Sequence, residues 1–389
     1  MPNRSQVDRA VLRDGPRHRT WARTDWGLVI AGLGLSLVGA LLVWSATRHA
    51  HGSSYLLRHL VNTALGIGLA AWVTRLDHRS LRAWTPLLYL LSVAGLLAVL
   101  TPAGSTVNGS RSWIQLPGGF SIQPSEFAKI AICIGMAVIL AERRDRDLEP
   151  GNRDVALAWL VALVPLGLVM LQPDLGSALV LGAIAFGVTA VAGASKRWLA
   201  GVFGLGAAGV AAAFTTPVLQ RYQRDRLIAF LDPSADPQGI GYQTRQVRVA
   251  IGSGGWSGQG LFQGGQTQGG FIPFQQTDFV FSVAGEELGF VGAAGLILLI
   301  GFLILRSVMI AARSADPFGR LVAVGVAVWF AFQAFENIGM NLGITPVTGL
   351  PLPFVSYGGS SMFVCWLALG LVNNVHLADA RRRSPRAGR

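Results

Sequence analysis

Long apolar runs alternate with short polar segments along almost the whole chain. A helix needs about 20 apolar residues to cross the hydrocarbon core of a bilayer. Ten runs approach or exceed that length, at 26–46, 55–75, 83–101, 124–141, 155–171, 175–193, 198–216, 280–305, 320–338 and 359–376. The pattern predicts an all-α polytopic membrane protein with about ten transmembrane helices. The first run lacks a small-residue cleavage site, so we interpret it as a retained anchor and not as a signal peptide.

Composition excludes the main alternatives to a membrane protein. Of the 389 residues, 51% are hydrophobic and only 13% are charged, and the mean hydropathy is +0.47. A soluble domain carries about a quarter charged residues, and a disordered chain has far less apolar surface. The two cysteines, Cys133 and Cys365, both lie in apolar runs. The sequence therefore predicts neither a disulfide framework nor a cysteine metal site.

The basic residues predict the orientation in the membrane. The net charge is +12, and in so apolar a chain it favours segments held at a membrane face over nucleic-acid binding. With both termini inside, the short outer segments hold only Arg48, Arg58 and Arg111, whereas every inner segment carries several Arg or Lys. This bias predicts cytoplasmic Arg-rich tails at 1–25 and 377–389, a transmembrane domain over 26–376, and a large extracellular loop at 217–279 between the seventh and eighth helices.

Ionisable residues near the predicted spans gather at one membrane face. Such residues are costly in hydrocarbon and usually functional. They are Glu126, Lys129, Asp174, Asp278, Glu286, Glu287 and Glu336, and in the predicted topology all lie at outer helix ends. A transporter places such groups near the bilayer midplane. The distribution therefore favours chemistry on a lipid-linked substrate at the outer face.

Most of these residues also have a structural interpretation. Glu126 and Lys129 are spaced i,i+3 and could neutralise each other. Glu286 or Glu287 could cap the eighth helix, and Asp174 fits an N-cap of the sixth. The Gly-rich segment 252–270 carries aromatic residues that a linker does not need, so we expect an ordered loop. The loop arginines could be solvated, contact headgroups or bind a pyrophosphate; they are Arg221, Arg224, Arg226, Arg245 and Arg248.

Several catalytic motifs are missing from the sequence. It contains no G-x-x-x-x-G-K-[ST], no H-E-x-x-H and no G-x-S-x-G. ATP hydrolysis, zinc hydrolysis and nucleophile-elbow serine hydrolysis are therefore not predicted.

Four segments carry a resemblance to a known family. They are Asn108–Trp113 with Gln123–Lys129, Gln172–Ser177, Ala250–Gly255 with Thr277–Gly289, and Asn337–Ser361. In this order they resemble the SEDS family (shape, elongation, division and sporulation), over everything except the two tails. Thr345–Pro351 is most similar to RodA, the elongation branch of that family. Gln276 departs from the pattern because many members have His there, so we assign it no role.

The resemblance implies a peptidoglycan glycosyltransferase that polymerises lipid II at the outer face of the bacterial plasma membrane. It also implies a class B penicillin-binding protein as the transpeptidase partner. Asp278 matches the family's candidate general base for an inverting transfer. Lys129 and Arg111, and after them Arg221, Arg245 and Arg248, are candidate cations for the leaving pyrophosphate. The further candidate substrate-binding residues are Arg58, Trp113, Gln123, Ser125, Glu126, Glu286, Ser356 and Ser360.

Some questions stay open from the sequence. A divalent cation, Mg²⁺ or Mn²⁺, could bridge the pyrophosphate, although no dedicated ligand cluster is visible. A lipid II flippase and a non-enzymatic scaffold of the elongation complex are the alternative functions. The lack of midplane charge weighs against the first, and the outer layer of acids and bases weighs against the second.

Overall fold

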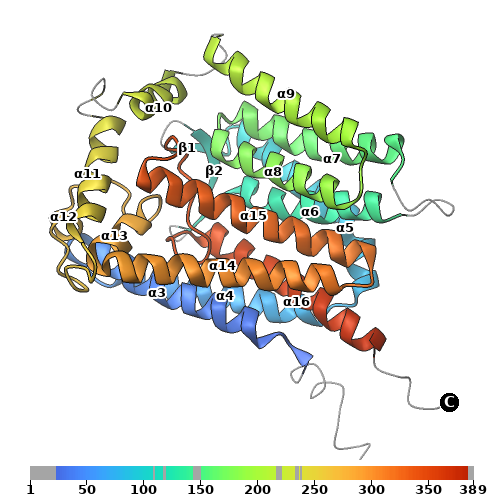
Figure 1. Ribbon diagram of the computed structural model, residues 1–389, viewed down its shortest axis with the longest axis horizontal. Coiled ribbons are helices and arrows are strands. Elements are labelled where there is room, and N and C mark those ends of the chain that lie inside the picture. Colours follow the sequence, from blue (N-terminus) through green and yellow to red (C-terminus); the bar gives the residue numbers. More distant parts are fainter. Residues whose placement is uncertain are drawn as a thin grey trace, which may run out of the picture.

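A computed structural model describes residues 23–107, 110–116, 120–142, 150–215, 221–232, 236 and 239–383. Most of the two predicted Arg-rich tails lies outside the described residues. The described chain is an elongated helical bundle with a small sheet and short helices at one end (Figure 1). The predicted all-α membrane architecture is confirmed apart from that sheet.

Long helices occupy the predicted apolar runs. They are α3 (Trp26–His51), α4 (Ser54–Arg75), α5 (His78–Leu100), α6 (Pro124–Ala141), α7 (Asn152–Leu171), α8 (Leu175–Val191), α9 (Lys196–Thr215), α14 (Gly289–Arg313), α15 (Pro317–Leu342) and α16 (Gly359–Arg383). Among the described residues, eight of these are long and apolar enough to cross a membrane, and α8 and α9 are not among the eight. The count of ten spans therefore stays a prediction.

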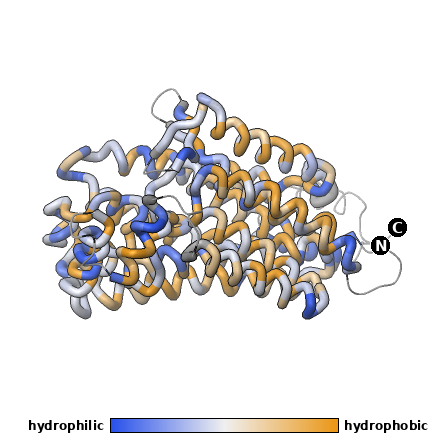
Figure 2. Tube along the Cα trace, turned by 90° about the horizontal axis from the view of Figure 1, so that it is seen from above, coloured by the Kyte–Doolittle hydropathy of each residue, from blue (hydrophilic) through white to orange (hydrophobic). Residues whose placement is uncertain are grey.

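Both ends of the described chain lie at the same end of the bundle. The Asp25 carboxylate caps α3 and pairs with Arg306 of α14, while the Asp25 backbone N–H donates to Asn373 Oδ1 of α16 at 3.1 Å. The more hydrophilic opposite end holds the segment that follows α9 (Figures 1 and 2). This arrangement is what a topology with both termini on one side of the membrane requires.

The predicted eighth span was wrong at its start. A short buried helix, α13 (Val280–Glu287), is separated from α14 by a break at Leu288. Gly289 has φ +67°, and a Cβ on it would come within 2.2 Å of the Gly258 backbone nitrogen. The close approach of the Gly-rich segment breaks the helix there. Glu286 and Glu287 consequently lie on α13 and not in the first turn of a long span.

The end of the bundle opposite the described chain ends also contains structure that hydropathy did not predict. Three antiparallel strands, β1 (Gly104–Val107), β2 (Ser110–Leu116) and β3 (Phe120–Ile122), form a sheet in the order β1-β2-β3. After α9 come α10 (Arg221–Leu231), α11 (Ile240–Ser253) and α12 (Gly265–Gly269). The expectation that residues 252–270 form an ordered loop is confirmed, because turns and α12 occupy it.

The helices differ strongly in burial. Helices α6, α15 and α16 form the centre of the bundle, and about three quarters of the residues in the most apolar stretch of each helix are buried. The aromatic rings of Phe330, Phe354 and Trp366 pack edge to face between them. Helix α9 instead packs on α8 and leaves Phe203 and Leu205 exposed by 70% and 75%. The bundle is therefore tight around the helices that carry the candidate site and open at α9.

Candidate active site

A cavity of about 220 Å³ lies at the end of the bundle opposite the described chain ends. Its wall is made by β2, the first turns of α6, α8 and α16, helix α10, and the segments 274–278 and 346–351. The polar residues on this wall are Ser110, Ser112, Gln123, Glu126, Asp174, Ser177, Gln223, Arg226, Thr277, Asp278, Thr348, Tyr357, Ser360 and Ser361. Segments more than 200 residues apart in the sequence thus form one polar chamber.

Asp278 lies on this wall, in the turn that leads into α13. Its backbone N–H donates to the Phe274 carbonyl at 3.1 Å, and its side chain is half-buried. Burial raises the pKa of Asp278 above its ordinary value of 3.8, while a hydrogen bond from Thr277 and the positive charge of Arg226 oppose that rise. A carboxylate of raised pKa beside a cation is suited to accept a proton.

Arg226 is a candidate site residue that the sequence did not single out. It comes from α10, and its Nη1 donates to the Thr348 carbonyl at 3.0 Å. Among the described residues it is the one Arg or Lys on the cavity wall. A guanidinium here can bind phosphate oxygens and stabilise developing negative charge. The sequence offered it only as one of five loop arginines.

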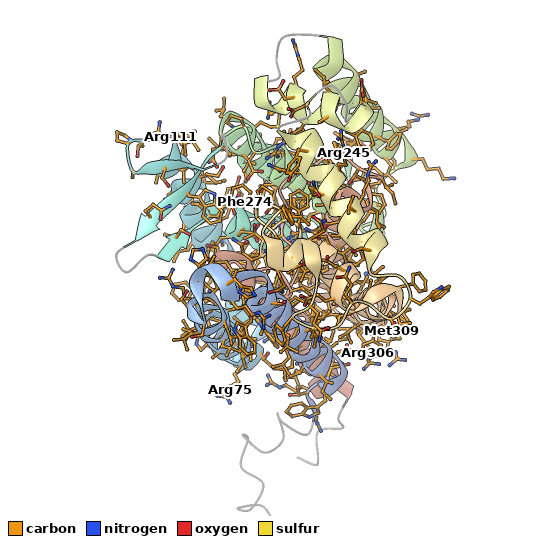
Figure 3. All side chains as sticks on the ribbon, turned by 90° about the vertical axis from the view of Figure 1, so that its left-hand side faces the viewer. Arg75, Arg111, Arg245, Phe274, Arg306 and Met309 are labelled. Atoms are coloured by element: carbon orange, nitrogen blue, oxygen red, sulfur yellow. The ribbon has the colours of Figure 1, made fainter. Side chains whose placement is uncertain are left out.

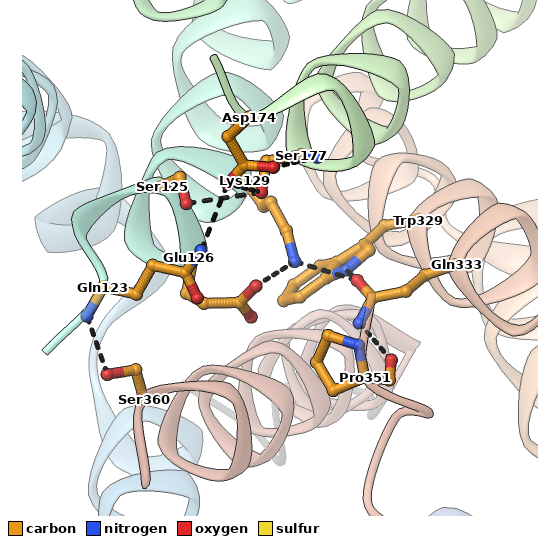
Figure 4. Close-up of polar contacts among 10 residues, drawn as sticks. All are labelled: Gln123, Ser125, Glu126, Lys129, Asp174, Ser177, Trp329, Gln333, Pro351 and Ser360. Atoms are coloured by element: carbon orange, nitrogen blue, oxygen red, sulfur yellow. Dashed lines mark hydrogen bonds and ion pairs between the residues drawn. The ribbon is translucent and has the colours of Figure 1, made fainter. Parts of the chain in front are cut away.

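Glu126 and Lys129 form a buried ion pair in α6 (Figure 4). Lys129 Nζ lies 2.5 Å from Glu126 Oε1 and 2.8 Å from Gln333 Oε1, and the two charged side chains are 0% and 1% exposed. Trp329 Nε1 donates to the same Gln333 oxygen at 2.7 Å. Glu126 reaches the cavity, whereas Lys129 does not line it. The structure therefore favours the pairing interpretation, and a contact of Lys129 with pyrophosphate stays a prediction.

A second polar cluster joins α6, α8 and α16 at the cavity (Figure 4). Asp174 caps α8 by accepting from Ser177 N at 3.0 Å, which confirms the predicted N-cap. Gln123 Nε2 donates to Asp174 Oδ2 at 3.2 Å, and Gln123 N donates to Ser360 Oγ at 3.0 Å. Ser125 Oγ lies 3.4 Å from Ser177 Oγ. Gln123 and Ser360 line the cavity, whereas Ser125 lies behind its wall.

Glu286 contacts groups within the protein, and its contact with substrate stays a prediction. Its carboxylate accepts from the N–H groups of Gln266 and Thr267, at 2.7 and 2.9 Å, and from Thr267 Oγ1. It is fully buried and does not line the cavity. Glu287 accepts from Ser45 Oγ at 2.5 Å. The two acids therefore fasten α12 and α3 to α13, so the expectation that they cap the eighth span was wrong.

Three other predicted arginines, Arg111, Arg245 and Arg248, are not on the cavity wall. Arg111 Nη2 donates to the Thr101 carbonyl at 2.7 Å, and Arg245 is exposed on α11; Figure 3 shows them on opposite sides of Phe274. Arg248 is likewise exposed on α11, and the side chain of Arg221 lies outside the described residues. The described side chains of Arg111, Arg245 and Arg248 do not line the chamber.

The remaining predicted residues lie at the cavity or next to it. Arg58 is exposed and hydrogen-bonds Tyr357 on the wall, where burial raises the pKa of the Tyr357 hydroxyl and Arg58 opposes the rise. Ser356 Oγ donates to the Thr277 carbonyl at 2.5 Å and so supports the wall from behind. Trp113 of β2 lines the cavity directly.

A resident metal has no evident protein ligand set here. In the described part of the chain, no three His, Cys, Asp or Glu side chains gather closely enough to hold a metal ion. The cavity acids Glu126, Asp174 and Asp278 do not form such a cluster. A divalent cation bridging the substrate's pyrophosphate stays a prediction.

Sequence comparison identifies the family. Residues 24–381 match the profile of the cell cycle proteins FtsW, RodA and SpoVE. The chain belongs to this family. It is the SEDS family that the four sequence segments predicted.

Similar SEDS proteins match over nearly their whole length. The probable peptidoglycan glycosyltransferase FtsW of Trichlorobacter lovleyi is 38% identical over 363 residues, which cover 91% of this chain and 93% of that protein. The peptidoglycan glycosyltransferase MrdB of Escherichia coli is 36% identical over 374 residues, covering 94% and 97%.

Solved structures agree with this assignment. One similar chain comes from a solved structure on the coordination of polymerization and crosslinking by a peptidoglycan synthase complex. It superposes with a TM-score of 0.77 at 36% identity, covering 92% of this chain and 98% of that one. The rod shape determining protein RodA of Thermus thermophilus superposes with a TM-score of 0.67 at 33% identity, covering 92% and 97%.

Proposed function

We propose that this SEDS protein is a peptidoglycan glycosyltransferase that polymerises lipid II at the outer face of the plasma membrane. The observation that carries the proposal is the pairing of Asp278 with Arg226 on one cavity wall at the outer end of the bundle. The names of its relatives support the same reaction class.

Asp278 acts as the general base in this reaction. The 4-hydroxyl oxygen of one lipid II forms a bond to the anomeric carbon of the growing chain, and its proton passes to the Asp278 carboxylate. The bond from that carbon to the pyrophosphate oxygen breaks, and undecaprenyl pyrophosphate leaves with the electron pair. One direct displacement converts the α-linked donor into a β-1,4 product, so one base suffices. A positioned base contributes about 10²- to 10⁴-fold in rate.

Arg226 stabilises the charge that develops on the leaving group. It faces the same chamber as Asp278, and its guanidinium can fork onto phosphate oxygens. Fixed donors aimed at developing charge usually make the largest single contribution to catalysis. A divalent cation bridging the pyrophosphate would add to this charge through oxygen atoms of the substrate.

The rest of the wall suits an amino sugar. Trp113 offers an aromatic surface to a pyranose ring. Glu126 Oε2 is buried and has no hydrogen-bond partner among the described residues, so it can accept from a hydroxyl or acetamido N–H. Helix α10 lines the cavity through Leu227 and leaves Leu231 exposed by 73%. This apolar edge offers a lateral exit for the polyprenyl tail.

We further propose an elongation role with a class B penicillin-binding protein as partner. The similarity of Thr345–Pro351 to RodA and the likeness to a chain from a peptidoglycan synthase complex support this. A lipid II flippase is the second candidate, but the cavity groups that could handle a polar headgroup lie at one end of the bundle.

Purified protein in liposomes containing labelled lipid II tests the proposal. We expect glycan polymer when the substrate faces the cavity end of the bundle. Movement of label between leaflets without polymer would favour the flippase, and neither outcome would favour a scaffold. Heat-denatured protein is the control for spontaneous exchange.

A further inference from the structure

The turn that carries Asp278 has an unusual backbone. Phe274 has φ +56°, a left-handed conformation that bulky side chains rarely adopt. Its carbonyl oxygen accepts from the N–H groups of Thr277 and Asp278, both at 3.1 Å, and of Phe279 at 3.4 Å. Such a conformation costs free energy and persists only when surrounding structure holds it.

Three consecutive carbonyls in this turn are each held from outside. Tyr357 N donates to the Gln276 carbonyl at 2.9 Å, and Ser356 Oγ donates to the Thr277 carbonyl. The Asp278 carbonyl accepts from two side chains of α15, Asn337 and Asn341.

The two asparagines of α15 contact the backbone of the turn that carries Asp278. Asn337 Nδ2 donates to the Asp278 carbonyl at 2.8 Å and to the Leu350 carbonyl at 2.7 Å. Asn341 Nδ2 donates to the Asp278 carbonyl at 3.2 Å, and its Oδ1 accepts from Ser282 N at 3.2 Å. Both side chains are fully buried and, four residues apart, lie on the same helix face.

Asn337 also connects the base to the cation. Its second hydrogen bond holds Leu350, and two residues earlier the Thr348 carbonyl holds Arg226. Between them, Gly349 has φ +76°, and a Cβ on it would lie 3.5 Å from Asp278 Oδ2 and 3.6 Å from Arg226 Nη1. One amide therefore ties the turn of Asp278 to the segment that anchors Arg226.

We propose that Asn337 and Asn341 are positioning residues that fix the Asp278 carboxylate relative to Arg226 and the attacking hydroxyl. The inference rests on the proposed role of Asp278 as the base. Neither asparagine touches the substrate, because neither lines the cavity. Their effect should therefore fall on the chemical step and not on substrate binding.

The test replaces Asn337 with leucine, which keeps its size and removes both donors. We expect kcat to fall about 100-fold while KM changes less than about threefold, because misplacement of a catalytic group by about 1 Å has that effect. Asn341→Ala, which removes one longer bond to the same carbonyl, should lower kcat about tenfold. Asn374→Leu is the matched control, because this buried asparagine also donates to backbone carbonyls, at Val73 and Leu76, but at the opposite end of the bundle.

A double-mutant cycle with Asp278→Glu separates positioning from folding. If Asn337 acts through Asp278, Asn337→Leu should lower kcat by less than about threefold once Asp278→Glu has already displaced the carboxylate. Asn374→Leu should lower the melting temperature and leave kcat per folded molecule unchanged in both backgrounds.

Wild-type kcat in folded Asn337→Leu or Asn341→Ala, or additive effects in the cycle, would overturn the proposal. If Asn337→Leu does not fold, the kcat of Asn341→Ala and its own cycle with Asp278→Glu decide. Failure of the base assignment is distinguishable, because Asp278→Asn would then polymerise like the wild type whatever the asparagine variants do.

Discussion

Replacing Lys129 with methionine should destabilise the protein more than replacing both members of its ion pair. Lys129 is fully buried, and its Nζ lies 2.5 Å from the carboxylate of Glu126, which is 1% exposed. Removing the cation alone leaves a buried carboxylate without its counter-charge, which costs about 3–5 kcal/mol. Replacing a buried pair with neutral side chains of similar volume is instead often neutral or stabilising, by about 1–4 kcal/mol. The expected order of stability is therefore Lys129→Met well below the wild type, and Glu126→Gln/Lys129→Met close to it.

The assay is thermal unfolding of the purified proteins in one detergent, followed by intrinsic tryptophan fluorescence. Lys196→Met is the matched control, because it removes the other lysine of the chain, which is exposed at the start of α9. Lys196→Met should unfold at the same temperature as the wild type. The reasoning would be refuted if Lys129→Met also unfolded with the wild type, or if the double variant lost as much stability as the single one.

Three further predictions concern the chamber and its supports. The acid limb of the kcat/KM profile should lie above pH 3.8, because activity needs ionised Asp278 and burial raises its pKa. Arg226→Gln should move that limb to higher pH, because it removes the positive charge that lowers the pKa of Asp278. A shift of the limb to lower pH would contradict the assignment. Gly258→Ala should lower the melting temperature, because at φ +81° its Cβ would come within 2.1 Å of a carbonyl oxygen of α13, whereas Gly252→Ala, with open space around it, should not. Trp113→Ala should raise KM about tenfold with little change in kcat, and an unchanged KM would exclude sugar stacking there.

Hydropathy predicted the long helices well because a membrane span must be apolar through its length. The run at 124–141 coincides with α6, and the run at 359–376 begins where α16 begins. The break at Leu288 was not predicted, because apolar residues on both sides of Glu286 and Glu287 let the run read as one span. It depends on the close approach of Gly258 and Gly289, which a hydropathy pattern does not contain. The strands at 104–122 are too short and too polar to stand out in the same way.

The candidate site was predictable where a residue type and its place in a motif agreed. Asp278, Glu126 and Trp113 all line the cavity. Charge alone did not show that Lys129 and Glu286 have partners inside the protein.

Other site residues needed the folded chain to distinguish them. Arg226 could not be separated from its neighbours in the loop, because only the fold turns one arginine of α10 toward the chamber. Asn337 and Asn341 lay in a matched segment, but their partners are backbone carbonyls. Sequence patterns do not record such partners.

The most direct test of the account compares polymerisation by the wild type and by Asp278→Asn. Both are purified, checked for folding by thermal unfolding and incubated with labelled lipid II, and the glycan products are separated on a gel. Asp236→Asn is the control, because Asp236 lies in the same segment at 217–279, accepts from the N–H groups of Gly239 and Ile240, and does not line the cavity. The account predicts polymer from the wild type and from Asp236→Asn, and a rate at least about 100-fold lower from folded Asp278→Asn. Polymerisation by Asp278→Asn within about tenfold of the wild type would contradict the general-base assignment.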